Sequence, residues 1–203
     1  RILVVASSRY TETGADQALF ESRATSIPGC FEILPRIRHD ARGRFVKVFH
    51  VDFFGANRLQ TRYAEEYYSK SVRGVIRGLH FQAPPMGHAK LVYCVEGRVQ
   101  DVALDLRRGS PSYGNYELFE LSAEGANMAY LPEGVAHGFC VLSDTATLVY
   151  KVSTVYSAEH DAGLLWSSAN IPWLVDDPIV SARDRAHPPF IDFVSPFVYR
   201  DER

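Results

Sequence analysis

Apolar and polar residues alternate along the chain from residue 31 onwards, in short runs separated by Gly, Pro, Asp or Ser. A period of two is typical of half-buried β-strands, because successive side chains point to opposite faces of a sheet. The first two predicted strands flank a turn at residues 39–43. The pattern predicts strands at 31–37, 44–53, 116–123, 127–134, 138–144 and 146–156, and two more within 91–111 that are joined at Glu96-Gly97.

Turn residues recur every few positions between these segments, which favours an all-β barrel or sandwich over β-α-β units. A short helix is predicted at residues 14–22, broken by Ile27-Pro-Gly-Cys30, and another after Ser181, a suitable N-cap. The Pro- and aromatic-rich end of the chain is expected to pack on the barrel or on a partner subunit. We therefore expect an N-terminal lead-in at 1–30, a barrel at 31–186 and a C-terminal tail at 187–203.

The composition is that of a globular domain, with 46% hydrophobic and 23% charged residues in 203 positions. A formal net charge of -2 gives no basic field for nucleic acid or membrane, and no apolar run has the length of a bilayer span. The three cysteines, Cys30, Cys94 and Cys140, are odd in number and widely spaced. We expect them to be buried free thiols in a reducing cytoplasm.

The stretch RGLHFQAPPMGHAKLVY, from Arg77 to Tyr93, concentrates ionisable groups within an apolar region. His80 begins a strand-rich block, and His137 follows a Pro/Gly turn in LPEGVAHGF. Facing strands that carry these two histidines would form a polar, largely dry pocket. We interpret the histidines at 39, 50, 160 and 187 as structural or surface residues.

These two motifs resemble those of small cupin-type barrels, many of which bind a divalent metal through histidines and a Glu. A metal set here would be His80, His88, His137 and Glu96. The set lacks a second histidine two positions after His80, where both side chains would face inward. His88 follows two prolines in an expected loop. We therefore expect no metal and no other cofactor.

Four further residues have both a functional and an ordinary interpretation. If its strand alternates regularly, Lys90 shares an inward face with Val92 and Cys94, and a buried lysine needs an anionic partner such as an enolate or a phosphate. Otherwise Lys90 faces solvent. Tyr150 and Tyr156 would share one face of a regular strand, as pocket or as core residues. Asp184 could be a carboxylate on a helix surface.

Five blocks of sequence together resemble the dTDP-4-dehydrorhamnose 3,5-epimerase family in order and spacing. The resemblance covers residues 31–186. It implies a cupin-type β-barrel, or jelly roll, with a few short peripheral helices, and a homodimer. The blocks are VRGVIRGLHFQ (72–82), HAKLVYCVEGRVQDVALDLRRGSPSYG (88–114), LPEGVAHGFCVLSD (131–144), LVYKVSTVYSAEHDAGLLWSS (148–168) and IVSARD (179–184).

The resemblance implies a metal-free epimerase that acts on a 4-keto-6-deoxy sugar linked to a nucleoside diphosphate. The keto group acidifies the hydrogens at C3 and C5, so a base can remove a proton and an acid can return one from the other face. By resemblance, His80 is the base, Asp184 orients it, Lys90 stabilises the enolate and Tyr156 is the acid. The implied substrate-binding residues are Arg42, Phe45, Glu65, Arg77, Gln82, His137 and Tyr150.

Two segments depart from the family pattern at positions that face the nucleotide or the sugar. The family pattern R-G-x-F-x-E is Arg42-Gly-Arg-Phe-Val-Lys47 here, and Q-x-N-x-S-x-S has Glu65 and Tyr67 in place of Gln and Asn. The reaction class is therefore better specified than the nucleotide, the sugar, or the choice between inversion at C3 alone and at both carbons. The alternatives are a metal-dependent cupin enzyme, a 3,4-ketoisomerase on the same scaffold and a non-catalytic sugar-nucleotide binder.

Overall fold

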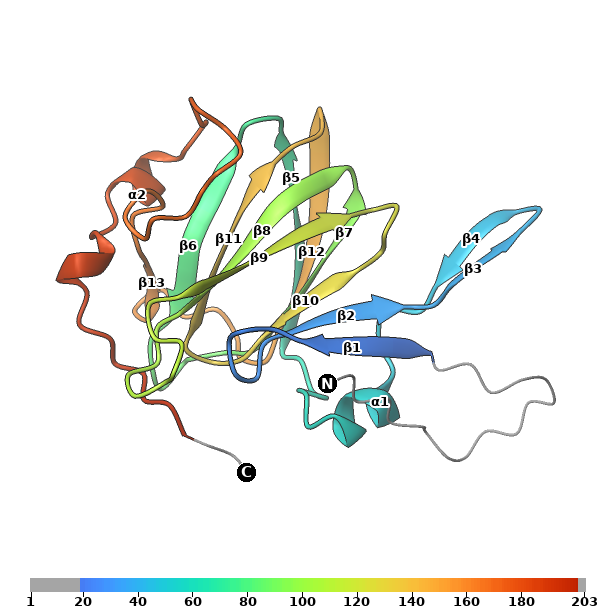
Figure 1. The fold of residues 1–203 in the computed structure, drawn as a ribbon, viewed down its shortest axis with the longest axis horizontal. Coiled ribbons are helices and arrows are strands. Elements are labelled where there is room, and N and C mark those ends of the chain that lie inside the picture. The colour runs from blue at the N-terminus through green and yellow to red at the C-terminus, as the bar shows by residue number, and fades with distance from the viewer. Residues whose placement is uncertain (1–18, 201–203) are drawn as a thin grey trace.

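The computed structural model describes residues 19–200, and two antiparallel sheets packed face to face form its body (Figure 1). The six-stranded sheet has the order β1 (Phe20–Ala24), β2 (Phe31–Pro35), β10 (Met128–Leu131), β7 (Lys90–Glu96), β12 (Thr145–Val152), β5 (Glu65–Val72). The five-stranded sheet has the order β13 (Asp161–Gly163), β6 (Ile76–Gln82), β11 (Val135–Val141), β8 (Arg98–Asp105), β9 (Tyr116–Ser122). The all-β, jelly-roll prediction is confirmed.

The core lies between the two sheets and follows from the alternation in the sequence. In β12, Ala146, Leu148, Tyr150 and Val152 are buried, while the residues between them are partly exposed. β7 and β8 meet at Gly97 as predicted, and Gly97 has a positive φ of 77° that suits glycine. The three cysteines are free and buried, also as predicted.

The predicted strand at 44–53 is wrong in its second half. β4 (Gly43–Val46) ends early, and residues 51–56 form a short helix, α1 (Val51–Ala56). Phe54 of α1 is completely buried in an aromatic cluster with Phe20 and Phe49, beside the outer face of the six-stranded sheet. The alternating aromatic residues looked like a strand, but their packing partners come from distant segments.

The predicted helix at 14–22 is also wrong where the structure describes it, since residues 20–22 belong to β1; residues 14–18 lie outside the described part. β1 pairs with β2 from Phe20 opposite Pro35 to Ala24 opposite Phe31. The predicted break at residues 27–30 is the turn between these strands. The six-stranded sheet therefore begins at Phe20, within the segment expected to be a lead-in.

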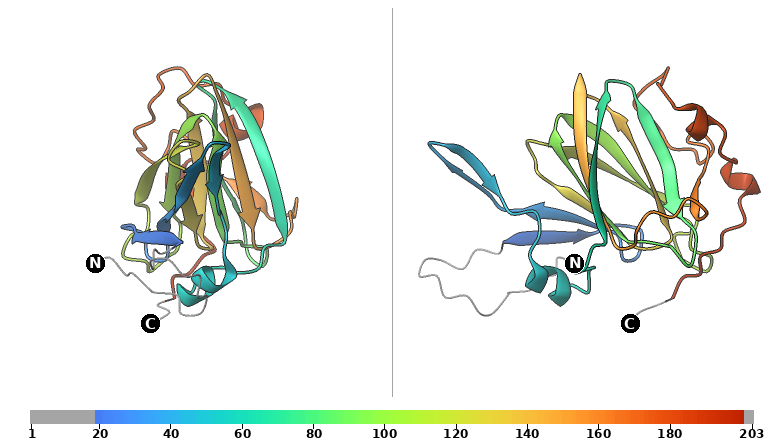
Figure 2. Two further views of the ribbon diagram at one scale, coloured as in Figure 1. Left: turned by 90° about the vertical axis from the view of Figure 1, so that its right-hand side faces the viewer. Right: turned by 180° about the vertical axis from the view of Figure 1, so that it is seen from behind.

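β3 (Ile37–Asp40) and β4 form a separate two-stranded hairpin that extends away from the body (Figures 1 and 2). The turn at its tip is the one predicted around residues 39–43. Arg42 at the tip pairs with Asp40 at 2.5 Å, and both side chains are largely exposed.

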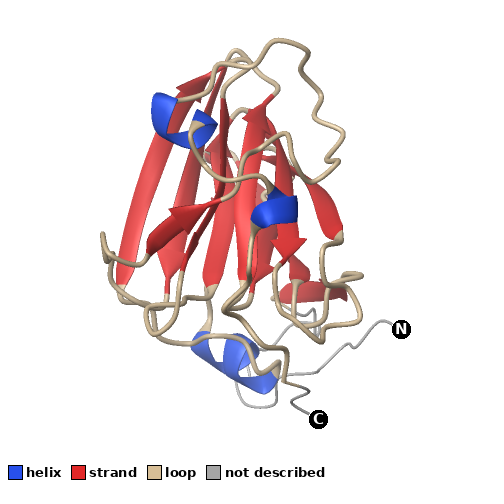
Figure 3. Cartoon of the chain, turned by 90° about the vertical axis from the view of Figure 1, so that its left-hand side faces the viewer, coloured by secondary structure: helices blue, strands red, loops and turns tan. Residues whose placement is uncertain are grey.

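The C-terminal segment lies beside β6 and β13 (Figure 1), on the side of the body that faces the viewer in Figure 3. The helix predicted after Ser181 is confirmed as α2 (Ala182–Arg185), where Ser181 Oγ accepts a hydrogen bond from the backbone N–H of Asp184. After the 3-10 helix η1 (Phe190–Asp192), Phe193 and Phe197 pack edge-on against Phe81 of β6. These contacts join the C-terminal segment to β6.

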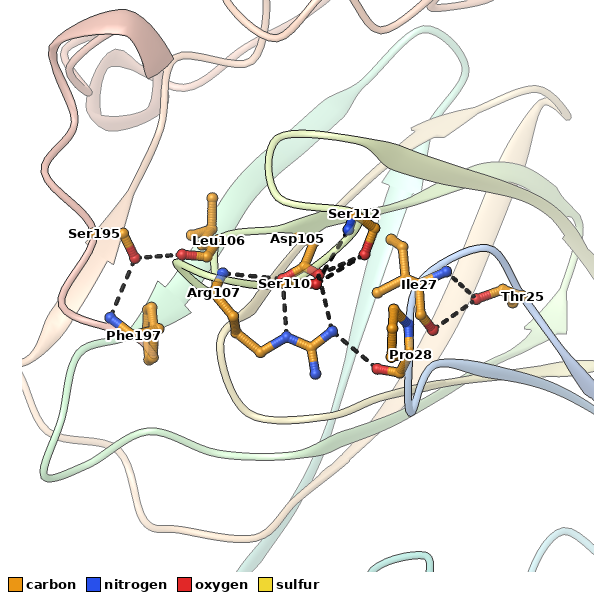
Figure 4. A network of polar contacts seen from close by, with 10 residues as sticks. All are labelled: Thr25, Ile27, Pro28, Asp105, Leu106, Arg107, Ser110, Ser112, Ser195 and Phe197. Carbon is orange, nitrogen blue, oxygen red and sulfur yellow. Dashed lines mark hydrogen bonds and ion pairs between the residues drawn. The ribbon is translucent and has the colours of Figure 1, made fainter. Parts of the chain in front are cut away.

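A buried polar network joins both ends of the described chain to the segment after β8 (Figure 4). Asp105 accepts hydrogen bonds from Arg107, Ser110 and Ser112. Arg107 also donates to the backbone oxygen of Pro28, in the β1–β2 turn.

Within residues 19–200, no helix is both long and apolar enough to cross a membrane.

Candidate active site

A pocket of about 380 Å³ opens between the two sheets. His80 and His137, on β6 and β11 of the five-stranded sheet, are direct cross-strand partners. Lys90 and Tyr150 enter from β7 and β12 of the six-stranded sheet. The predicted site residues that line the pocket are Glu65, Arg77, His80, Gln82, Lys90, His137, Tyr150 and Tyr156.

His80 and Asp184 form a hydrogen-bonded pair, with 2.8 Å between His80 Nε2 and Asp184 Oδ1. The other carboxylate oxygen accepts from the backbone N–H of Gly78. Burial of Asp184 opposes its charge, but the hydrogen bonds from His80 and Gly78 lower its pKa to about 2. The carboxylate is therefore ionised and accepts the proton of His80 Nε2, which leaves Nδ1 of His80 as the basic nitrogen.

His137 forms a second pair, with Asp101 of β8, at 2.7 Å between Nε2 and Oδ2. Both side chains are buried, and Asp101 Oδ1 has no hydrogen-bond partner within the described residues. Burial raises the pKa of Asp101, and the interaction with His137 opposes this shift. Asp101 was not among the predicted site residues, although a carboxylate inside the apolar strand RVQDVALD signals a need for a buried partner.

Lys90 is buried with its ammonium group at the pocket, which agrees with the inward interpretation of its strand. Its Nζ donates to the backbone oxygen of His80 at 3.2 Å. Burial lowers the pKa of Lys90 to about 8, while the charges of Asp161 and Asp101 act in the opposite direction. Among the described hydrogen bonds the ammonium has one acceptor, so it retains donors for a ligand.

The two tyrosines are in different environments, contrary to the expectation that they share one strand face. β12 ends at Val152, so Tyr156 lies in the following loop, 62% exposed, with its hydroxyl donating to Asp161 at 3.3 Å. Tyr150 is buried in the pocket wall, and its hydroxyl shares a hydrogen bond with the hydroxyl of Ser69 at 2.9 Å. Its ring stacks on that of Tyr67, with 4.9 Å between the ring centroids. Burial raises the pKa of Tyr150.

Basic and polar groups line the rest of the pocket. Arg77 Nε donates to Ser71 Oγ at 2.9 Å. Gln82 is held inside the wall, where it donates to the backbone oxygens of residues 86 and 155 and accepts from the backbone N–H of residue 157. Glu65 Oε1 accepts from the backbone N–H of Tyr156. Arg183 was missed by the sequence analysis; it lines the pocket and pairs with Asp161 at 2.8 Å.

Asp184 reaches the pocket through His80, whereas Arg42 and Phe45 do not line the pocket of their own chain. Both lie on the β3–β4 hairpin, and Phe45 is 61% exposed. The sequence motif marked them as ligand contacts, but it could not specify where the hairpin would point.

The metal set considered from the sequence is not assembled. Glu96 accepts hydrogen bonds from Lys70, Thr145 and Thr147 and does not line the pocket. His88 does line the pocket, with Nδ1 near the side-chain nitrogen of Gln82, and burial lowers its pKa to about 3. The predicted carboxylate is therefore absent from the site, which does not favour the metal-dependent cupin alternative.

A jelly roll of two sheets, with a carboxylate-held histidine and a buried lysine in the pocket between them, defines a cupin-type protein whose pocket holds groups suited to proton transfer. The chain belongs to the dTDP-4-dehydrorhamnose 3,5-epimerase family, whose sequence profile matches residues 24–192. It is therefore an isomerase, and the expected family assignment is confirmed.

Three similar proteins illustrate the range of the family. The dTDP-4-dehydrorhamnose 3,5-epimerase of Shigella flexneri is 43% identical over 171 residues, which cover 83% of this chain and 94% of that protein. The dTDP-4-dehydrorhamnose 3-epimerase of Streptomyces niveus is 45% identical over 80% of both chains. The dTDP-6-deoxy-D-glucose-3,5-epimerase of Legionella pneumophila Philadelphia 1, solved with dTDP-4-keto-L-rhamnose, has a TM-score of 0.85 and 30% identity over 89% of this chain and 100% of that one.

Proposed function

We propose that the enzyme epimerises a 4-keto-6-deoxy sugar carried on a nucleoside diphosphate, through an enolate and without a cofactor. The family relationship supports this substrate class, since relatives are named for such sugars. The 4-keto group makes the hydrogens at C3 and C5 acidic, so the reaction needs a base, a stabiliser of the enolate oxygen and an acid on the opposite face.

The observation that carries the proposal is the His80–Asp184 pair beside a buried lysine. Because the ionised carboxylate holds the proton on Nε2 of His80, the lone pair on Nδ1 can take a proton from the sugar. The imidazolium that results is stabilised by Asp184 at 2.8 Å. Burial of Asp184 strengthens this interaction relative to water.

Lys90 is the group that we assign to the enolate oxygen. When the base removes the proton, negative charge develops on the 4-keto oxygen, and a preorganised ammonium group lowers the energy of that charge. Lys90 approaches from the six-stranded sheet, and its Nζ contacts the backbone oxygen of His80. The cation and the base therefore lie close to the same part of the pocket. Asp101 and Asp161 favour the charged form of Lys90.

For the opposite-face acid we propose Tyr150 in place of Tyr156, the residue expected from the sequence. His80 belongs to the five-stranded sheet and Tyr150 to the six-stranded sheet, so they approach a sugar between the sheets from opposite sides. Tyr156 is mostly exposed and bonded to Asp161, whose strand pairs with β6, the strand of His80. We assign Tyr156 to the mouth of the pocket, as a substrate-binding residue.

The diphosphate is assigned to the arginines of the pocket. Arg77 and Arg183 both line it, and a planar guanidinium suits phosphate oxygens. Gln82 and Glu65 shape the wall, while His137, held by Asp101, lines the sugar end. The nucleotide of the relatives is dTDP, which makes it the first candidate here. Tyr67 and Lys47 replace residues of the family pattern. They are therefore the positions most suited to alter the preference for dTDP.

We further propose a homodimer in which the β3–β4 hairpin of each subunit completes the pocket of its partner. The hairpin extends away from its own body (Figure 2). It exposes Arg42 and Phe45, a cation and an aromatic ring suited to a phosphate and a base. An exposed aromatic ring on an extended hairpin gains stability when a second subunit covers it. In the proposed dimer, each diphosphate lies between Arg77 and Arg183 of one subunit and Arg42 on the hairpin of the other.

A cytoplasmic location is proposed with this function, as expected from the sequence. The three buried cysteines are free, which suits a reducing compartment.

The experiment that tests the function is proton NMR in deuterium oxide, with a panel of 4-keto-6-deoxy sugars linked to dTDP, GDP and CDP. Loss of both the H3 and H5 signals on one member establishes a 3,5-epimerase and identifies its nucleotide. Loss of H3 alone establishes a 3-epimerase. His80→Ala serves as the control and is expected to abolish exchange. Exchange that persists in this variant, or a 3-keto product, would overturn the proposed reaction.

A further inference from the structure

His187 lies beside the His80–Asp184 pair in a position that the proposed reaction does not use. Its Nε2 is 3.8 Å from Asp184 Oδ1, and its ring stands nearly perpendicular to that of His80, with 5.9 Å between the centroids. His187 Nε2 is buried and has no hydrogen-bond partner within the described residues. An unpartnered nitrogen at this depth points to a ligand, because buried polar atoms are normally satisfied.

The surrounding structure holds the His187 ring in place. Gly163 of β13 lies against it, and a Cβ atom at this glycine would be only 2.5 Å from His187 Nε2. The residue that follows His187 is fixed by a hydrogen bond from the backbone N–H of Leu165 to the backbone oxygen of Pro188. Any side chain at position 163 would push the ring out of its site, so the fold leaves room for an imidazole here.

His80, Asp184 and His187 each offer one donor atom, and these three atoms all lie within 4.8 Å of one another. Two imidazoles and one carboxylate form a donor set that suits Zn²⁺. We propose that these three residues bind Zn²⁺ and that the bound ion inhibits the enzyme. Asp184 supplies the anionic ligand of the site, and the nearby Asp161–Arg183 pair is neutral as a unit.

Inhibition follows from the tautomer of His80, and this step rests on the proposed function. An ion bound at Nε2 needs the lone pair of that nitrogen, so the single proton of the neutral ring must reside on Nδ1. Nδ1 is the atom that would otherwise accept the proton from the sugar. Because the ion lies behind the base rather than in the sugar site, we expect Zn²⁺ to lower kcat with little change in KM.

The binding test uses untagged, chelator-treated protein and Zn²⁺ as the probe, measured by isothermal titration calorimetry. Wild-type protein is expected to bind one equivalent per chain, and His187→Ala to bind at least tenfold more weakly, since a lost ligand removes at least as much affinity as a lost supporting contact. His160→Ala is the matched control, a histidine outside the cluster that bonds Ser157. His187→Asn is the substitute if the alanine variant does not fold.

The activity test separates this inference from the proposed function. His187→Ala is expected to epimerise in the absence of Zn²⁺ and to need at least tenfold more Zn²⁺ for half inhibition. Equal Zn²⁺ binding by wild type and His187→Ala, or no binding by wild type, would overturn the zinc site. Failure of every sugar nucleotide to react would leave the calorimetric result intact, because that measurement needs no substrate.

Discussion

Asp184 Oδ1 accepts a hydrogen bond from His80 Nε2 at 2.8 Å, while Asp184 Oδ2 accepts one from the backbone N–H of Gly78, on the same strand as His80. One carboxylate therefore fixes both the ring and the backbone of the base. Asp184→Asn keeps an acceptor for Gly78 but loses the charge that stabilises an imidazolium. We expect kcat to fall by about two orders of magnitude or more, the usual loss when general-base catalysis fails. Steady-state kinetics with a sugar nucleotide would check this.

Ser181→Ala is the structural control for this substitution. It removes the cap of α2 but leaves the carboxylate of Asp184 in place. The loss of a cap costs about 1 kcal/mol of stability, so the melting temperature should fall while kcat stays near the wild-type value. If Asp184→Asn retains wild-type kcat, the assigned role of the pair is wrong.

The roles of Tyr150 and Tyr156 can be distinguished by comparing exchange of the sugar hydrogen with inversion of the carbon that carries it. Tyr150→Phe keeps the base, so H3 should still exchange with deuterium oxide, but the inverted product should form at least a hundredfold more slowly because the acid on the opposite face is lost. Tyr156→Phe should retain inversion and raise KM. Proton NMR reports both exchange and configuration in one experiment. The opposite result for the two variants would restore Tyr156 as the acid.

Most of the strands could be predicted because each carries its own alternation of buried and exposed residues. β12 is an example, with every second side chain in the core. α1 could not, since Phe49, Val51 and Phe53 also alternate and only the burial of Phe54 among distant aromatic residues makes the segment helical. β1 was missed for a similar reason, because its strand conformation depends on pairing with β2.

The site was predictable where a motif identified the chemistry and not where the fold alone brings residues together. His80 and Lys90 share one motif, and Asp184 belongs to a recognisable helix start. His187 follows Asp184 by three positions, but its contact with His80 depends on the packing of β13 and gave no sequence signal. The spacing of Tyr150 and Tyr156 predicted one shared strand face, which is wrong because the strand ends at Val152.

Asp105 is expected to make the free energy of unfolding sensitive to acid. Its burial opposes ionisation, but hydrogen bonds from Arg107 and Ser110 lower its pKa below the ordinary value (Figure 4). The unfolded chain binds this proton more tightly, so the stabilisation is complete above about pH 4 and is lost as the pH falls through the folded pKa. Asp105→Asn leaves Arg107 unpaired in the interior and should cost about 3–5 kcal/mol at neutral pH, with a weaker dependence on acid.

Urea unfolding of both proteins over a series of acidic pH values would measure this effect. Asp144→Asn is the control, because Asp144 pairs with Arg73 on the surface and its side chain is 96% exposed. That variant should have nearly the wild-type free energy of unfolding. A parallel decline of wild type and Asp105→Asn on acidification would show that another group is responsible.

The position of Arg42 on the extended hairpin allows a test of whether each pocket is built from two subunits. Arg42→Ala should raise KM because it removes a phosphate contact, and His80→Ala should abolish turnover. In a mixed dimer of the two variants, one pocket receives a native hairpin from the His80→Ala subunit and a native base from the Arg42→Ala subunit. Random exchange gives mixed dimers in about half the population, with one native site in two, so activity at low substrate should recover to about a quarter of wild type.

A mixture of His80→Ala with Asp184→Asn provides the matched control, since both changes affect groups of the same chain's pocket. No arrangement of those two subunits contains a native His80–Asp184 pair in one pocket, so no recovery of activity is expected. Recovery in the first mixture and not in the second means that the hairpin acts on its partner. No recovery in either, with subunit exchange verified by mass spectrometry, means that Arg42 serves its own subunit or none, and that the exposed hairpin has another role.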